Sequence, residues 1–505
     1  MNTGLATRAS RGALASAGGQ GLRIVVQMAS VVVLARLLAP ADYGLIAEVL
    51  TIVGLGEIFR DFGLSSAAVQ AKRLSDAERS NLLWLNSLIG VALMVIACAL
   101  SPVVALLYGD PRLTTVTLVL SLVFLINGVS TQFRADLNRN LMFGRTVTAE
   151  VAGQILGLGL GVFMALNGAG YWALVGQQLL QSAVTFVVVV AYARFRPQRY
   201  RRDVSMRRFL GFGFDVVGGQ LLGYAGKNTD TFVIGTTMGA VTLGYYNRAF
   251  QLLSLPLSQI NAPATRVALS VLSRLHDDSR RYARYLLAGQ TVMLHLVLAV
   301  FSLTAALAAP LIALVLGPQW GPSVPLFQAL AVAGVFQTAG YATFWVFLSK
   351  GLTRSQLWWQ VASRPVVVAV VALGAIWGVQ GVAIAYASAS ALAWAAGLLW
   401  IRRVANVPVR AMFTNVLKAV VGYALAGAAA AATLLLPTGA HIWSALLVGA
   451  AAWLLALGVV TAVWPAFRRD VRTIVSVVRT FRAGRGRVAP APQPAPDEDV
   501  PASVV

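Results

Sequence analysis

The stretch GYAGKNTDTFVIG, residues 223–235, places Lys227, Asn228 and Asp230 inside a run that is otherwise apolar. A lysine in such a place could attract an anion such as a phosphate, and an aspartate could take up a proton or a cation. Because residues three apart share one helix face, Lys227 and Asp230 could instead form an ion pair with each other. The choice between these interpretations depends on whether the surroundings are a membrane.

The composition indicates an all-α polytopic membrane protein. Of 505 residues, 58% are hydrophobic and only 11% are charged, and the mean hydropathy is +0.73. A soluble globular chain has a much more polar balance. The net charge of +22 does not indicate nucleic-acid binding, because the basic residues are scattered between apolar segments rather than gathered in one soluble region. The single cysteine, Cys98, lies in an apolar run and offers no disulfide framework.

Apolar runs of about 17–25 residues predict membrane-spanning helices. The sequence predicts about 14 transmembrane helices, at residues 11–37, 43–59, 81–107, 113–132, 146–166, 171–193, 209–235, 242–272, 285–315, 323–349, 355–376, 381–401, 411–435 and 442–466. The first of these is too long and too polar for a cleaved signal peptide, and we expect it to remain as an anchor.

The connecting segments predict the orientation. Of the 40 lysines and arginines, 33 lie in one alternating set of segments: 1–11, 60–80, 133–145, 194–208, 273–284, 350–354, 402–418 and the tail from 467. The other set holds one basic residue, Arg112. The positive-inside rule then places both termini in the cytoplasm, in a multi-pass protein of the cytoplasmic (plasma) membrane.

An internal repeat predicts two pseudo-symmetric six-helix bundles. An offset of 200 residues superimposes 31–50 on 231–250 without a gap, so that Gly44 falls on Gly244 and Glu48 falls opposite Arg248. Duplication of this kind is common in transporters. The predicted domains are an N-terminal lobe with its cytoplasmic linker at 1–208, a C-terminal lobe at 209–403, two additional helices at 404–466, and a basic segment with a disordered tail at 467–505.

Polar stripes predict which helices face water. Spacings of three and four residues align Gln20, Arg23, Gln27 and Ser30 in the first helix, and the seventh and eighth helices carry similar stripes. Such stripes cannot face hydrocarbon, so these three helices should surround a hydrated central cavity or pack polar face to polar face. Six basic residues lie within the predicted helices: Arg23, Arg36, Lys227, Arg248, Arg266 and Arg364.

Arg23, Lys227 and Arg248 lie on or beside the stripes and form the predicted anion site. Burying a cation at mid-membrane costs about 2.5–3.5 kcal/mol on insertion scales, which argues against an idle structural role. Gln27 and Gln251 lie on the same stripes and complete the predicted substrate-binding set. Glu48 and Asp230 are the candidates for coupling to a proton or sodium ion. The three histidines show no metal-ligand spacing, and we expect no cofactor, no metal and no catalytic residue.

Several stretches resemble the Wzx-type oligosaccharide flippases of the multidrug, oligosaccharidyl-lipid and polysaccharide exporter superfamily. The residues that carry the resemblance are RLLAPADYGLIAEV (36–49), DFGLSSAAVQAKRLSDAERSNLLWLN (61–86), NTDTFVIGTTMGAVTLGYYNRAFQLLSLPLSQI (228–260) and LGPQWGPSVPLFQALA (316–331). The resemblance implies two helical bundles around a cationic cavity that alternates between inward-open and outward-open states. It also implies that the first, second, seventh and eighth helices line this cavity.

The cargo implied by the resemblance is an undecaprenyl-pyrophosphate-linked oligosaccharide, flipped from the inner to the outer leaflet for polysaccharide export. Its partners would be the bilayer and a polymerase and glycosyltransferases of the same pathway. The alternatives are a multidrug or organic-cation exporter, whose cavity should be acidic, and a peptidoglycan-precursor flippase. A membrane glycosyltransferase or polymerase would need sizeable external loops, and the predicted ones have only about four to seven residues, so we expect no enzyme.

The segment FRRDVRTIVSVVRTFRAGRGR, residues 467–487, combines an apolar helical face with seven arginines. This pattern is typical of a helix that lies on an anionic inner leaflet. The same residues could also be a solvated basic stop after the last span. The Pro-rich remainder predicts disorder.

Overall fold

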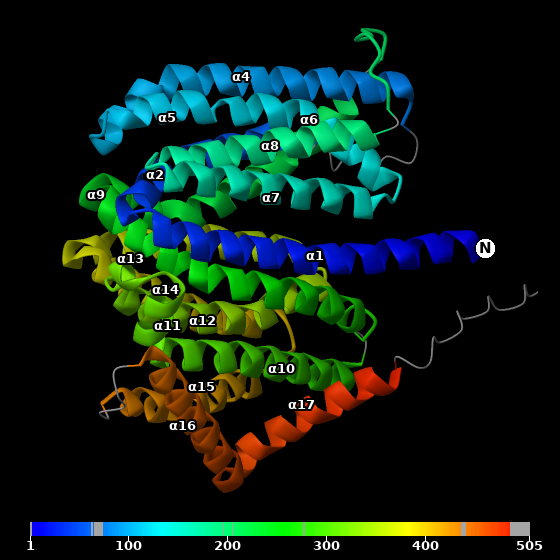
Figure 1. The fold of residues 1–505 in the computed structure, drawn as a ribbon. Helices are drawn as coiled ribbons and strands as arrows, with labels where there is room; N and C mark the ends of the chain where they lie inside the picture. The colour runs from blue at the N-terminus through cyan, green and yellow to red at the C-terminus, as the bar shows by residue number, and fades with distance from the viewer. Residues whose placement is uncertain are drawn as a thin grey trace, which may run out of the picture.

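The computed structural model describes residues 3–61, 64, 74–193, 195–204, 206–275, 278–435 and 441–484. The described residues form long helices joined by short connections (Figure 1). The helices are α1 (Thr3–Leu37), α2 (Pro40–Asp61), α4 (Asp76–Tyr108), α5 (Arg112–Leu120), α6 (Leu122–Arg139), α7 (Phe143–Leu166), α8 (Trp172–Tyr192), α9 (Arg207–Leu272), α10 (Ser279–Ala306), α11 (Ala308–Val315), α12 (Ser323–Ser349), α13 (Thr353–Gly374), α14 (Gly378–Val404), α15 (Val409–Ala432), α16 (Ile442–Val463) and α17 (Pro465–Gly484). Short 3₁₀ turns lie at Pro318–Trp320, Ala375–Trp377 and Thr433–Leu435.

The polytopic helical architecture is confirmed, whereas the number of membrane crossings stays a prediction. Ten stretches of the described chain are long and apolar enough to cross a membrane, and one of these, Thr353–Val404, contains both α13 and α14. Each of the fourteen predicted ranges is helical over most of its length. α2 is not among the ten stretches, because it carries Asp42, Glu48 and Glu57 as well as Arg60.

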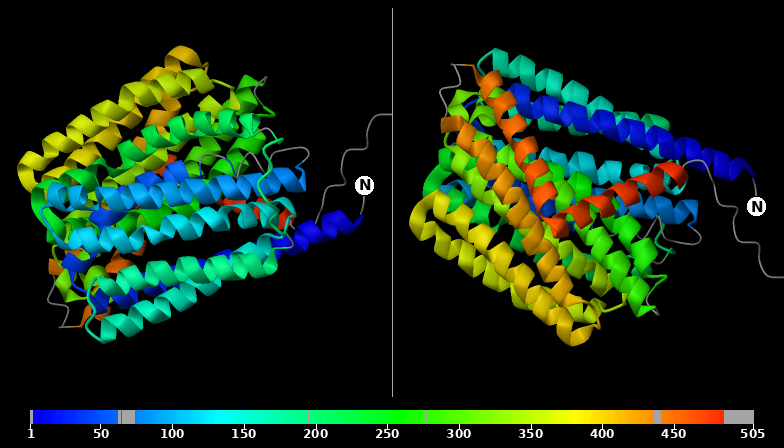
Figure 2. Two further views of the ribbon diagram at one scale, coloured as in Figure 1. Left: turned by 90° about the horizontal axis from the view of Figure 1, so that it is seen from above. Right: turned by 90° about the horizontal axis from the view of Figure 1, so that it is seen from below.

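Two groups of helices lie side by side. Figure 1 shows α4–α8 in one group and α10–α14 in the other, with α1 and α9 between them and α15–α17 at the far edge of the second group. The two views of Figure 2 show the long helices running in broadly the same direction. We call the end of the bundle with the connections after α6, α8 and α12 the basic end. The other end, with the connections after α4, α7 and α11, is the opposite end.

α9 is a hairpin of two helical limbs. Gly239 has φ 78° and ψ 172°, which interrupts the helix between a first limb at 207–238 and a second limb at 240–272. A straight helix would hold residues 230 and 246 about 24 Å apart, yet the Tyr246 hydroxyl donates a hydrogen bond of 2.6 Å to Asp230. The second limb therefore folds back along the first. A glycine stands at this break because only glycine adopts a positive φ without strain.

The two halves of the chain meet in an apolar core near the opposite end. This core combines α1, α2 and both limbs of α9 with α10–α14, and it buries Tyr43, Tyr246 and Trp320. Large apolar side chains on the outer flanks remain exposed, including Leu106 at 82% and Val463 at 74%. Such a surface suits hydrocarbon rather than water.

Candidate functional site

A polar cavity of about 500 Å³ lies between the two halves of the chain. α1, α2, α7, α8 and both limbs of α9 contribute to its lining, and Leu120 of α5 completes it. The lining side chains of α1 come from residues 26–34 and those of α2 from residues 43–51, so the cavity lies toward the opposite end of the bundle. Polar cavities enclosed by membrane-spanning helices are where transporters bind substrates.

Amides dominate the polar part of the lining. Its glutamines and asparagines are Gln27, Gln154, Gln177, Gln178, Gln181, Gln251, Asn228 and Asn247. Each amide offers both a donor and an acceptor, as a hydroxyl-rich ligand requires. Gln177 of α8 donates a 2.8 Å hydrogen bond to Ser30 of α1, which fixes one of these amides in the wall.

Arg248 is the charged residue of this lining, and the other lining residues that the structure describes are neutral. Its guanidinium lies over the ring of Tyr43, 3.5 Å from the ring centroid, and donates a hydrogen bond to Gln251. A guanidinium has five N–H donors and never loses its charge in proteins. Donors therefore remain for an anionic ligand in the cavity.

The cavity is closed toward the opposite end by close contacts between α2 and the second limb of α9. A Cβ added to Gly44 would overlap the Ala240 carbonyl, and one added to Gly244 would overlap the Pro40 carbonyl. The two contacts are equivalent under the repeat, because an offset of 200 residues relates Gly44 to Gly244 and Pro40 to Ala240. The Trp320 indole adds to the closure by donating a 2.8 Å hydrogen bond to the Ala35 carbonyl.

Three of the five predicted substrate-binding residues line the cavity: Gln27, Arg248 and Gln251. Arg23 is not among the lining residues and instead forms a 2.7 Å ion pair with Glu150 of α7, one helix turn closer to the basic end. The side chain of Lys227 lies outside the described residues, so its predicted roles stay predictions. The polar stripe of the eighth predicted helix includes Ser254 and Thr265, and only the first of these lines the cavity. Thr265 instead accepts a hydrogen bond from Trp345.

The two candidate coupling carboxylates lie behind the cavity wall. Asp230 is 2% exposed and accepts hydrogen bonds from the Tyr246 hydroxyl, at 2.6 Å, and from the Thr231 backbone N–H, at 2.8 Å. Glu48 is 1% exposed, and its Oε2 has no hydrogen-bond partner among the described residues. Neither carboxylate is among the residues that line the cavity. The hydrogen-bond partner of Asp230 is thus Tyr246, which the three-residue spacing of Lys227 and Asp230 did not predict.

Sequence reasoning missed the contribution of α7 and α8. Gln177 and Gln181 are four residues apart in one predicted helix, which was a usable signal for a polar face. It was overlooked because none of the glutamines in α7 and α8 is charged. Arg364 was also set aside, although its side chain lies against Gly226 in the first limb of α9, one turn before Asp230.

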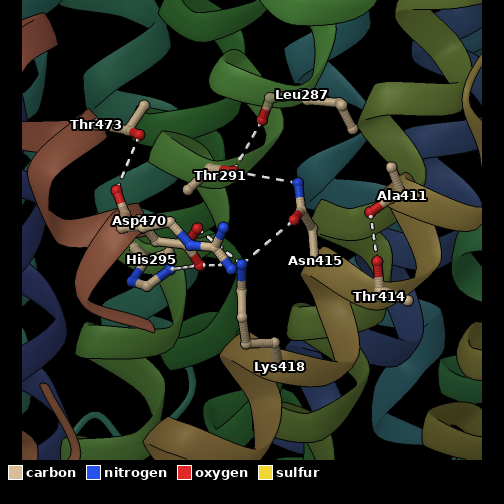
Figure 3. A network of polar contacts seen from close by, with 10 residues as sticks. Leu287, Thr291, His295, Ala411, Thr414, Asn415, Lys418, Asp470 and Thr473 are labelled. Atoms are coloured by element: carbon tan, nitrogen blue, oxygen red, sulfur yellow. Dashed lines mark hydrogen bonds and ion pairs between the residues drawn. The ribbon is translucent and has the colours of Figure 1, made fainter. Parts of the chain in front are cut away.

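A second polar network lies outside the cavity, where α17 meets α10 and α15. Figure 3 shows Asp470 between Lys418 and His295. Lys418 Nζ lies 2.6 Å and 2.7 Å from the two carboxylate oxygens, and His295 Nε2 lies 3.3 Å from Oδ2. Lys418 lies inside α15, within the predicted helix 411–435, although the count of basic segments also included this residue in 402–418.

The start of α17 is packed against the bundle rather than solvated. Phe467 is fully buried beside His295 and Tyr423, and Asp470 is 8% exposed. Asp470 follows the last candidate span, which ends at Val463. Burial alone would raise the pKa of the Asp470 carboxyl, but the hydrogen bonds from His295 and Lys418 outweigh it and hold the pKa below its usual range.

Comparison with protein families places residues 33–325 in a family described as polysaccharide biosynthesis protein. Curated relatives include the teichuronic acid biosynthesis protein TuaB of Bacillus subtilis (strain 168), 29% identical over 310 residues, which are 60% of this chain and 63% of TuaB. The lipopolysaccharide biosynthesis protein WzxC of Escherichia coli (strain K12) is 27% identical over 61% of this chain and 63% of WzxC. The chain therefore matches somewhat less than two thirds of the length of these relatives.

Solved structures share the fold. The lipid II flippase MurJ in an inward closed conformation superimposes with a TM-score of 0.68 at 14% identity, over 90% of this chain and 99% of MurJ. An inward-facing multidrug resistance transporter of the MATE family superimposes with a TM-score of 0.59 at 16% identity, over 78% of this chain and 96% of that transporter. At these identities the likeness extends to the arrangement of helices alone.

Proposed function

The chain belongs to the polysaccharide biosynthesis protein family, which confirms its resemblance to the Wzx-type flippases, and from this premise we propose a specific transport function. The protein flips an undecaprenyl-pyrophosphate-linked oligosaccharide from the inner to the outer leaflet of the cytoplasmic membrane by alternating access. The glycan then serves polysaccharide export, together with a polymerase and glycosyltransferases of the same pathway.

The neutral amide lining of the cavity around a single described cation carries this proposal. Sugars present many hydroxyl groups, and the glutamines of α1, α7, α8 and α9 can donate to and accept from them. The pyrophosphate is an anion, and the planar guanidinium of Arg248 is suited to bind it through two parallel hydrogen bonds. An organic-cation exporter would need a carboxylate in the same place, and the described lining holds none.

Alternating access requires the closure at the opposite end to open. In the present conformation the halves are held there by the Gly44 and Gly244 contacts and by Trp320 and Gln319, which both donate to the Ala35 carbonyl. The ion pairs nearer the basic end, Arg23 with Glu150 and Arg60 with Glu57, each join residues of the first half of the chain. This distribution supports a state that admits substrate from the basic, cytoplasmic side.

Reconstitution with a fluorescent lipid-linked oligosaccharide tests the function. Proteoliposomes of the native protein should move the fluorophore to the far leaflet, where an impermeant quencher reaches it. Arg248→Ala should reduce the rate roughly ten- to hundredfold, as expected for the loss of a charge-assisted hydrogen bond of about 1.5–3 kcal/mol. Arg248→Lys should retain part of the rate.

Arg266→Ala is the matched control, because Arg266 lies on the same limb of α9 outside the cavity lining. Equal losses in both variants would contradict a binding role for Arg248. A native protein that moves an organic cation and leaves the glycan in place would support the multidrug alternative. Movement of a peptidoglycan precursor alone would support the other alternative, which shares the chemistry of the cavity and differs in the sugar.

We also propose that Lys227 binds the pyrophosphate. If so, Lys227→Ala should stop transport in a folded protein, and adding Asp230→Ala should not restore it. If Lys227 only neutralises Asp230, the double variant should recover both expression and transport, since removing both partners of a buried pair is milder than removing one. Transport by the double variant would therefore exclude the binding role.

Coupling to a proton or sodium ion through Glu48 or Asp230 completes the proposal. Both carboxylates are buried beside the cavity wall, where an ion exchange could alter the packing of α2 against α9. Glu48→Gln and Asp230→Asn each remove one ionisable group with little change of shape. The variant that loses the dependence of flipping on a proton or sodium gradient identifies the coupling residue, and retention of the dependence in both variants would exclude both.

The orientation is tested by labelling single cysteines in intact cells after Cys98 has been replaced. Asn167→Cys lies at the opposite end and Ser279→Cys at the basic end, and both positions are exposed. An impermeant reagent should label the first and not the second. The reverse pattern would invert the proposed direction of transport.

A further inference from the structure

A second cavity, of about 340 Å³, lies in the seam between α1 and the second half of the chain. It is lined by Ile24, Gln27, Met28, Leu252, Leu255, Pro256, Gln259, Val300, Phe301, Thr304, Leu311, Ile312, Val315 and Phe327. These residues come from α1, the second limb of α9, α10, α11 and α12. We call this cavity the seam groove.

The seam groove is apolar, in contrast to the neighbouring cavity. No described charged residue lines it, and its polar members are Gln27, Gln259 and Thr304. The Thr304 hydroxyl already donates a 2.8 Å hydrogen bond to the Val300 carbonyl of its own helix, so its donor does not require a hydrogen-bond acceptor from a ligand in the groove. An apolar ligand would lose little hydrogen bonding by entering.

Gln27 lines both the seam groove and the polar cavity. The two spaces therefore meet at one position of α1, with amides and Arg248 on one side and aliphatic side chains on the other. A ligand that spans both must have a polar part joined directly to an apolar chain.

The seam also reaches the lipid-facing surface. α1 packs along α7 of the first half, and its end is tied to the second half by Arg36, which donates to the Leu314 carbonyl, and by Ala35, which accepts from Trp320. Nearer the basic end, the flank of α1 is exposed at Leu22 (48%), Val25 (63%) and Met28 (37%). Because Met28 both lines the groove and is exposed, a chain could leave the groove into the bilayer there.

We propose that the seam groove binds the first isoprene units of the polyprenyl tail while the pyrophosphate and sugars occupy the polar cavity. This inference rests on the proposed function and adds a tail-binding site to it. Pockets that hold whole drug-sized ligands measure about 300–1,000 Å³, so a groove of 340 Å³ holds only a short part of a long polyprenyl chain. The remainder of the tail extends into the lipid beside α1.

Filling the groove should weaken binding of the tail and leave binding of the head unchanged. Val300→Trp and, as a second variant, Thr304→Phe place a large ring in the groove. Leu296→Trp is the matched control, because Leu296 lies on the same helix and is 51% exposed outside the groove. Thermal unfolding of each purified variant shows whether it is folded.

Two probes are compared: the full lipid-linked oligosaccharide and the same oligosaccharide pyrophosphate without its tail. The groove variants should bind the full substrate about tenfold more weakly, the equivalent of two buried methylene groups, and bind the tail-less probe like the native protein. Equal binding of the full substrate by native and groove-filled proteins would overturn the tail site while the proposed function stands. A native protein that binds neither probe would instead remove the proposed function.

A photoreactive diazirine in the first isoprene units gives an independent reading. It should crosslink to Met28, Leu255 or Val300 in the native protein and lose these crosslinks in the Val300→Trp variant. Crosslinks confined to the outer flanks would contradict the proposal. Equal labelling of the same three residues by a diazirine-bearing phosphatidylglycerol would show an ordinary phospholipid site instead.

Discussion

The polar cavity and the Asp470 network are both groups of polar side chains among apolar helices, and they differ in whether charge is balanced. In the network, the carboxylate of Asp470 contacts the Lys418 ammonium at 2.6 Å and the His295 ring at 3.3 Å. In the cavity, which measures about 500 Å³, the guanidinium of Arg248 lies over a tyrosine ring, and the surrounding polar side chains are neutral amides.

This difference separates a structural role from a binding role. Two opposite charges that neutralise each other in a closed contact leave nothing for a ligand to recognise. A cation that retains donors toward a cavity, with no carboxylate in the described lining, keeps an attraction for an external anion. A charge between apolar helices therefore does not identify a site until its partners are known.

The largest expected effect is on stability, from Asp470→Ala. This change leaves the Lys418 ammonium with no carboxylate partner in a mostly buried position, which costs about 3–5 kcal/mol. We expect the free energy of unfolding in detergent to fall by that amount, while transport per folded molecule is retained. The double change Asp470→Leu with Lys418→Leu should cost far less. A stable Asp470→Ala protein that no longer transports would place the network in the transport mechanism.

The next largest effect is on flipping, and it is expected when a carboxylate is introduced beside Arg248 to neutralise its charge, as Asp470 neutralises Lys418. Gln251 already accepts a hydrogen bond from Arg248, so Gln251→Glu should form an ion pair there. Flipping should fall roughly tenfold or more because the pair competes with the anionic substrate, and thermal stability should not decrease. Gln328→Glu, outside both cavities, is the control. An unchanged flipping rate in the Gln251→Glu variant would contradict the proposal that Arg248 must be free of a carboxylate partner to bind the anionic substrate.

A smaller effect is expected at the contact that closes the cavity. The added Cβ of Gly244→Ala overlaps the backbone carbonyl of Pro40, so one helix must shift. Overpacking of this kind costs about 1–3 kcal/mol, and we expect a lower midpoint of thermal unfolding. Gly223→Ala, where no atom lies within 4 Å of the added Cβ, should be neutral. Equal behaviour of the two variants would argue against a tight closure.

The smallest effect is a response of the network to acid. The pKa of Asp470 is lowered in the folded state, so the stabilisation is fully present above the unfolded pKa of about 3.9. It is lost as the pH falls through the lower folded value. The packing of α17 should therefore persist at pH 5 and loosen below about pH 4, as seen by protease cleavage within α17. Loosening that is already complete between pH 5 and 7 would contradict control of this contact by the Asp470 carboxylate.

The sequence by itself determined the helices and the general place of the site. Apolar runs long enough to span hydrocarbon appear directly in the order of residues, because each helix satisfies its own backbone hydrogen bonds. Spacings of three and four residues predicted that Gln27, Arg248 and Gln251 share polar faces, and the structure places all three in one lining. The repeat also pairs Gly44 with Gly244, and these two glycines make the close backbone contacts that close the cavity.

Only the tertiary structure decided which polar residues face the cavity and which face each other. Asp230 contacts Tyr246 because α9 folds back at Gly239, and Lys418 contacts Asp470 because α17 returns against α15. Helical periodicity relates residues within one helix and says nothing about which face meets which neighbour. Pairing between distant segments depends on packing in three dimensions, and that packing decides whether a buried charge is neutralised or remains free to bind.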